Sequence, residues 1–244
     1  RFGILIIPSF GRKIMKRILI SVISLLVSLT ALAGNNDIYI TQTGTGLTLT
    51  IDQIGATNTV GTSSTRAVLS GTTMTVDIDQ IGSSNSIVAS ILQGNNSSWT
   101  YSNTGSSATA TFAVGGTGDV AGSDFDWTAS GGDGNILAWT QGAAATATGG
   151  NQDFIISGAG NNINATCEVV GCINNWDITG DSNDIDTTQT GSANHNITVD
   201  LTGSSMNIDI DQTDSTSTNV ANLLLQSSGG SGSSVNIDQC ATGC

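Results

Sequence analysis

The sequence is almost without proline and, beyond its first 33 residues, almost without positive charge. It has 244 residues, a single proline and six basic residues, five of which precede Gly34. Lysine and glutamate, which long amphipathic helices use heavily, are nearly missing, whereas glycine, serine, threonine, asparagine and aspartate are abundant. This composition disfavours a domain built from long helices.

The scarcity of positive charge also excludes two classes of partner. After residue 33, Arg66 is the only basic side chain against 19 carboxylates, so this part of the chain has a net charge of −18. It has no cationic patch that could release counterions from nucleic acid or attract anionic lipid. We therefore expect no nucleic acid partner and no membrane insertion.

The N-terminal region has the pattern of a secretory signal peptide. Met15-Lys16-Arg17 is a basic start, residues 18–29 are mostly apolar, and residues 31–33 form an Ala-x-Ala cleavage signal. A transmembrane anchor is the alternative, but the apolar stretch is short for a span. We predict an upstream extension over 1–14, a signal peptide over 15–33, and a secreted domain over 34–244 that is exported through the periplasm.

A short repeat with the template apolar-x-apolar-x-Gln-x-Gly-x-x-Asn recurs along the secreted domain. The two most similar copies occupy residues 49–58 and 76–85, and others lie at 38–44, 185–194, 208–212 and 235–239. Residues 99–175 repeat only loosely.

Each copy alternates apolar and polar residues, as a strand with one buried face does. Val76, Ile78 and Gln80 point one way, and Asp77 and Asp79 point the other. Several glycines are 11 residues apart, which fits one strand plus a turn, so two units make a rung of roughly 22 residues. One rung cannot bury its apolar face, but stacked rungs can. We predict an all-β fold, a β-solenoid of stacked strand-turn-strand repeats.

Inward amides of successive rungs should then lie above one another and hydrogen-bond along the stack. The predicted ladder residues are Gln42, Gln53, Asn58, Gln80, Asn85, Gln189, Asn194, Gln212 and Gln239. The glycine two positions after each glutamine suits a tight turn with positive φ. The predicted turn glycines are Gly44, Gly55, Gly82 and Gly191.

These repeats resemble those of the curlin family, the subunits of curli fibres. The central curlin motif, Gln-x-Gly-x-x-Asn, is present at 53–58, 80–85 and 189–194. The resemblance implies a secreted subunit that polymerises by cross-β stacking into an extracellular amyloid fibre for biofilm matrix and adhesion. The partners it implies are further copies of the chain, a nucleator subunit and outer-membrane secretion machinery.

Four cysteines form two close pairs, which in an exported chain predicts disulfides. Cys167, Cys172, Cys240 and Cys244 allow three connectivities, and we expect the two local ones. A metal site is the alternative, although the spacings are unusual for one. We expect no cofactor.

Little in the sequence points to catalysis. His195 is the only histidine and Glu168 the only glutamate, and no nucleophile motif accompanies them. We interpret His195 as a solvated turn residue and expect that the protein is not an enzyme.

Two other functions remain open, a non-polymerising solenoid adhesin and an ice-binding protein. Four tryptophans could contact sugars, although we favour core packing for them: Trp99, Trp127, Trp139 and Trp176. Thr-x-Thr pairs at 48/50, 73/75, 109/111 and 146/148 could order water on a flat face, but their uneven spacing favours ordinary β-propensity.

Overall fold

The computed structural model describes residues 15–21, 26–32, 35–115, 120–131, 134–142, 151–168, 172–191, 195–214, 219–227 and 232–240. All helices and strands assigned in these ranges are β-strands. The strands are β1 (Met15–Ser21), β2 (Leu26–Leu32), β3 (Asn35–Thr43), β4 (Thr48–Ile54), β5 (Thr57–Val60), β6 (Ala67–Ser70), β7 (Thr75–Gln93), β8 (Ser98–Val114), β9 (Asp124–Ser130), β10 (Asn135–Gln141), β11 (Asn151–Ser157), β12 (Gly160–Cys167), β13 (Ile173–Thr179), β14 (Ser182–Gly191), β15 (Asn196–Gly203), β16 (Ser205–Asp214), β17 (Val220–Ser227) and β18 (Ser234–Cys240). Residues 1–14, Asn194 and Cys244, for which the sequence makes predictions, lie outside the described residues.

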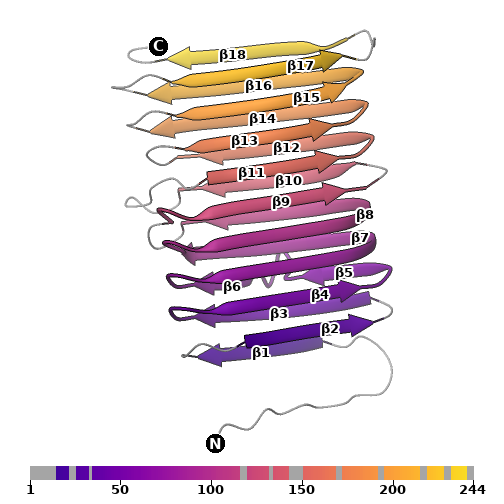
Figure 1. The fold of residues 1–244 in the computed structure, drawn as a ribbon, viewed down its shortest axis with the longest axis vertical. Coiled ribbons are helices and arrows are strands. Elements are labelled where there is room, and N and C mark those ends of the chain that lie inside the picture. Colours follow the sequence, from indigo (N-terminus) through magenta and orange to yellow (C-terminus); the bar gives the residue numbers. More distant parts are fainter. Residues whose placement is uncertain are drawn as a thin grey trace, which may run out of the picture.

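The strands stack into two facing sheets, and every recorded pairing within them is parallel (Figure 1). We call sheet I the stack of β2, β4, the first half of β7, the first half of β8, β9, β11, β13, β15 and β17. Sheet II is the stack of β1, β3, β5 with β6, the second half of β7, the second half of β8, β10, β12, β14, β16 and β18. The chain alternates between the sheets, so the predicted β-solenoid is confirmed.

Coil length varies more than the predicted 22 residues. Asn161 pairs with Asn183 one coil later, a separation of 22, whereas Gln53 pairs with Gln80 after 27. In the longer coil, residues 61–66 form a loop between β5 and β6, closed by Thr62 and Thr65 bonding each other's backbone. This loop accounts for the long glycine step from Gly55 to Gly71.

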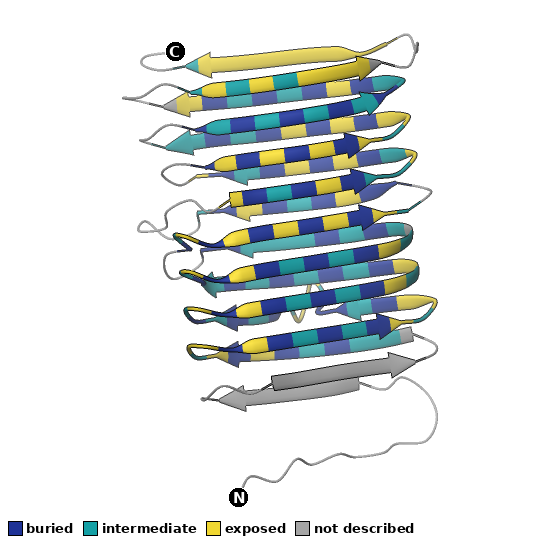
Figure 2. Cartoon of the chain, in the orientation of Figure 1, coloured by how far each residue is buried: buried dark blue, intermediate teal, exposed yellow. Residues whose placement is uncertain are grey.

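Alternate residues of the strands point into the space between the sheets. In β9 the burial pattern is strictly exposed, buried, exposed, with Phe125, Trp127 and Ala129 inside. Figure 2 shows the same stripes across most of the stack. The core is therefore a narrow column of side chains that runs the length of the molecule.

Strands are also assigned within the predicted signal peptide. β1 pairs with β3 and β2 pairs with β4, so both sheets continue into residues 15–32. Cleavage after residue 33 remains a prediction. Among the described residues no helix is long and apolar enough to cross a membrane.

Candidate functional site: the internal ladders and the open end

Glutamines of sheet I form a hydrogen-bonded ladder near the N-terminal end of the stack. Gln53 and Gln80 are both fully buried, and Gln80 donates from Nε2 to Gln53 Oε1 at 2.7 Å and to the Ser86 carbonyl at 3.2 Å. Tyr101 continues the ladder, because its hydroxyl donates to Gln80 Oε1 at 2.6 Å. Burial raises the pKa of the Tyr101 hydroxyl, which keeps this group a donor.

Asparagines at the start of the sheet II strands form a second ladder beside the first. Asn36 donates to Asn58 Oδ1 at 3.2 Å, and Asn58 donates to Asn85 Oδ1 at 3.0 Å. Asn58 also reaches the carbonyls of Gln53 and Ile81, at 3.3 and 3.0 Å. The amide side chains therefore join successive coils and close the turn within one coil.

The ladders extend further than the sequence prediction. Asn135 donates to Asn161 Oδ1 at 3.0 Å, and Asn161 donates to Asn183 Oδ1 at 2.8 Å, although none of the three was predicted. The preceding glutamine is lost in these coils, so the full template no longer matches. A Gly-x-x-Asn pattern survives at 158–161 and 180–183 and could have identified two of them.

Glutamines of sheet II form a third ladder toward the C-terminal end. Gln212 donates to Gln189 Oε1 at 2.6 Å, and Gln239 donates to Gln212 Oε1 at 2.6 Å. Gln42, the first predicted member of this sheet, is buried but donates only to the adjacent Thr43 carbonyl. Leu69 and Ile91 follow it in the stack and offer no acceptor.

The turn glycines are needed for close approach between coils more than for positive φ. Of the four predicted, Gly44 has a positive φ of 149°, but Gly55, Gly82 and Gly191 do not, so the φ prediction is wrong for those three. A Cβ on Gly82 would lie 1.8 Å from the Gly55 carbonyl oxygen. Glycine is therefore required at Gly82 because each coil stacks directly on the previous one.

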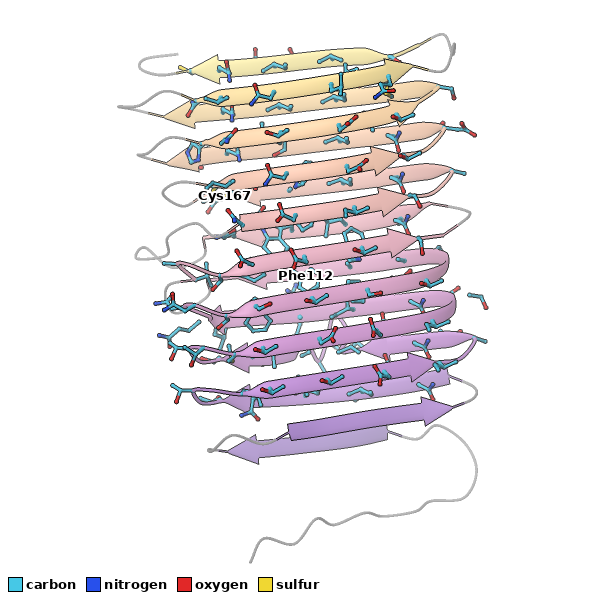
Figure 3. The ribbon with its side chains drawn as sticks, viewed as in Figure 1. Phe112 and Cys167 are labelled. Atoms are coloured by element: carbon cyan, nitrogen blue, oxygen red, sulfur yellow. A yellow bond between two sulfur atoms is a disulfide. The ribbon has the colours of Figure 1, made fainter. Side chains whose placement is uncertain are left out.

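Residues 99–175, loosely repetitive in sequence, form a continuous part of the solenoid with an aromatic core. In sheet I, Tyr101 stacks on Trp127 at 6.0 Å between centroids, and Phe154 stacks on Trp176 at 5.7 Å. From sheet II, Phe112 contacts Trp139 at 5.5 Å (Figure 3). All four tryptophans are buried, which confirms the core-packing interpretation.

The predicted disulfide between Cys167 and Cys172 is present, at the turn between β12 and β13. Cys240 is also disulfide-bonded, while its predicted partner Cys244 lies outside the described residues. Cys167 occupies a position of the sheet II glutamine column, between Gln141 and Gln189. Because the cysteine offers no acceptor there, Gln189 Nε2 is buried without a hydrogen-bond partner.

His195 is not a solvated turn residue, and that interpretation is wrong. Its side chain is fully buried at the start of β15, where it stacks in the coil above Cys172. The Cys172 backbone N–H donates to His195 Nδ1 at 3.5 Å, and the His195 carbonyl accepts from the Val220 N–H at 2.9 Å. The side chain fills an inward position of sheet I.

The outward faces carry rows of carboxylates. Burial raises the pKa of Asp211, and the neighbouring charges of Asp209, Asp238 and Asp186 raise it further. The pKa of Asp77 is raised by burial and by Asp79 and Asp52. These rows therefore repel themselves at neutral pH.

Asparagines interrupt the carboxylate rows and relieve part of this repulsion. Asn207 donates to Asp184 Oδ1 at 2.8 Å, and Asn236 donates to Asp209 Oδ1 at 3.0 Å. In the part of the chain that the structure describes, no group of three or more His, Cys, Asp or Glu residues could hold a metal ion.

The C-terminal end of the stack is open. β18 pairs with β16 on one edge, and no described strand pairs with its other edge. Val235 and Ile237, at inward positions, are 43% and 40% exposed, whereas Ile210 below them is fully buried. The core and the sheet edges are therefore uncovered at this end.

Comparison of the chain with protein-family models, with curated proteins and with solved structures found no match. The fold, the ladders and the open end are therefore the observations from which function is inferred.

Proposed function

We propose that this protein is a secreted structural subunit that self-assembles, end to end, into extracellular curli-like amyloid fibres of a biofilm matrix that supports adhesion. The observation that carries the proposal is the open C-terminal end. There, β17 and β18 present free edges, and inward Val235 and Ile237 remain exposed. An uncovered strand edge with apolar side chains beside it is a template for another chain.

The second copy supplies strands that match this template. β3 and β4 carry buried apolar side chains and the amides that begin the sheet I and asparagine ladders. Removal of residues 15–33 during export uncovers their edges, since β1 and β2 otherwise pair with them. Assembly is therefore confined to the outside of the cell. A nucleator subunit and outer-membrane secretion machinery are the partners that such a subunit uses.

The other two functions are less well supported. All four tryptophans lie in the core, so they present no sugar-binding surface. The threonine pairs also fail to form a flat row, because Thr48 pairs with Thr75 but Thr50 pairs with Asp77. Thr109 and Thr111 lie in the other sheet.

A charge placed inside the open end tests the proposal. Ile237→Lys puts a cation where the next coil must cover it, so we expect fibre growth to slow by at least about tenfold. Asn236→Lys adds the same charge on the outward face of the same strand and should form fibres readily. Negative-stain microscopy and seeded Thioflavin T time courses measure both variants. A wild-type chain that forms no fibres, or an Ile237→Lys variant that grows as fast as Asn236→Lys, would contradict the proposal.

A further inference from the structure

The first and last strands of the exported domain lie in the same sheet. β3 belongs to sheet II, and so does β18, while β17 is the last strand of sheet I. The domain therefore contains a half-coil beyond a whole number of coils. At its C-terminal end, the next free position is in sheet I, above β17.

This half-coil restricts how a second copy can be added. If the copy kept the same orientation, its β3 would pair with β18, and one strand position between its β4 and β17 would stay empty. A half-turn about the solenoid axis exchanges the two sheets and reverses their strand directions. After that rotation, β3 of the second copy lies on β17 and its β4 lies on β18, parallel in both sheets, with no position left empty.

We propose that consecutive copies in the fibre are related by a half-turn about the solenoid axis, with β3 of one copy on β17, and β4 on β18, of the preceding copy. This inference rests on the proposed fibre function and specifies its subunit contact.

The side chains of β18 and β4 match in this arrangement. In register, Leu49 covers Val235 and Ile51 covers Ile237, which buries the apolar residues that are exposed in the single molecule. Gln53 then lies above Gln239, so the C-terminal glutamine ladder of one copy continues into the N-terminal ladder of the next.

The direction of the amide hydrogen bonds matches as well. In both glutamine ladders the residue nearer the C-terminus donates from Nε2 to the Oε1 of the residue before it. Gln239 therefore presents its Oε1 to the incoming copy, and Gln53 presents its Nε2. Donor and acceptor meet without a change of rotamer.

The contact between β17 and β3 is similar. In register, Ile40 covers Leu223, and Asn36 covers Asn219. In the asparagine ladder the residue nearer the N-terminus donates from Nδ2 to the next Oδ1. Asn219 thus faces Asn36 in the polarity of the existing ladder, and its Nδ2 already bonds the Gln212 carbonyl as Asn58 bonds that of Gln53.

Pairs of engineered cysteines distinguish the two orientations. Asp238 lies on the outward face of β18, next to Asp52 of the second copy after a half-turn and next to Thr41 without one. Paired residues on adjacent parallel strands are about 4.8 Å apart, within the range that a disulfide can bridge. The cysteines of the described chain have no free thiols, so the introduced pair reports the contact.

The chain is expressed with its leader, collected after export, polymerised and oxidised. We expect Asp238→Cys with Asp52→Cys to give a ladder of covalent oligomers on denaturing gels, and Asp238→Cys with Thr41→Cys to stay monomeric. The reverse result, or fibres without crosslinks in either pair, overturns the half-turn but leaves the fibre function intact. A wild-type chain without fibres instead overturns the function itself.

Helical reconstruction of wild-type fibres tests the inference without any substitution. We expect successive copies to be related by a half-turn in addition to the gradual twist of the sheets, with a rise of about 40 Å per copy. Copies stacked without that half-turn would contradict the arrangement.

Discussion

At the scale of single residues, buried amides determine which side chains the core tolerates. A buried polar group without a hydrogen-bond partner costs about 1–3 kcal/mol, so each ladder member depends on the residues above and below it. Gln80 illustrates this dependence, since it bonds Gln53, Ser86 and Tyr101.

Replacing Gln80 by leucine should therefore be more harmful than its similar volume suggests. Gln80→Leu leaves the Tyr101 hydroxyl and Gln53 Oε1 buried without their partner, and we expect the free energy of unfolding to fall by about 2–4 kcal/mol. Urea denaturation of the unpolymerised chain, followed by circular dichroism, measures the loss. Ser102→Ala, on the outward face of the adjacent strand, is the control and should change little.

The glycine columns allow a second test at this scale. Gly82→Ala places a Cβ 1.8 Å from the Gly55 carbonyl, so the coils must separate and we expect a loss of about 3 kcal/mol or more. At Gly160 the nearest atom, the Ser182 carbonyl oxygen, is 3.3 Å from the added Cβ, so Gly160→Ala should be much milder. Equal losses for the two variants in the same urea experiment would contradict this account of Gly82.

At the scale of the strand, the outward carboxylates couple stability to pH. The folded-state pKa of Asp211 lies above its ordinary value of 3.8, so the folded chain binds its proton more tightly than the unfolded chain does. The unfavourable effect of its ionisation is absent below about pH 3.8 and develops as the pH rises through the folded-state value.

Asp211→Asn should therefore stabilise the protein at pH 7 and have little effect near pH 3. Because the side chain is largely exposed, we expect a rise in Tm of only about 1–2 °C. Thr166→Asn changes the same outward row without removing a charge and should leave the pH dependence as it is. Thermal melts at both pH values make the comparison, and a stabilisation that is equal at the two values would contradict the account.

Strands with strong alternation could be predicted from the sequence, and irregular coils could not. Val76, Ile78 and Gln80 alternate so regularly that their inward face was evident. The role of residues 99–175 was less evident because aromatic rings replace the amides there, and Trp127 packs where a repeat template expects Ile or Val.

Other features depend on contacts that a linear pattern does not contain. His195 follows a polar turn motif, yet its position above Cys172 buries it. The need for glycine at Gly82 comes from Gly55 in the preceding coil, 27 residues earlier, and local turn propensity does not reveal it.

At the scale of the whole molecule, net charge opposes assembly and the open end favours it. The half-turn arrangement brings Asp52 of one copy beside Asp238 of the other, so the contact adds two carboxylates to an already repulsive row. Protonation or salt should relieve this repulsion.

We therefore expect seeded fibre growth in low salt to be faster at pH 5 than at pH 7. The double variant Asp52→Asn with Asp238→Asn should grow faster at pH 7 and lose much of this dependence. Asp126→Asn with Asp177→Asn removes the same charge from the middle of the molecule and should keep more of it. Thioflavin T time courses compare the three chains, and identical pH profiles would contradict the assigned contact.

Fibre diffraction tests the central claim most directly, because the claim concerns the direction in which coils stack. The exported chain is polymerised, the fibres are aligned and X-ray diffraction is recorded. End-to-end stacking predicts a meridional reflection at about 4.8 Å, from strands perpendicular to the fibre axis, and an equatorial reflection near 10 Å from the two facing sheets. A 4.8 Å reflection on the equator, or its absence from well-aligned fibres, would contradict it.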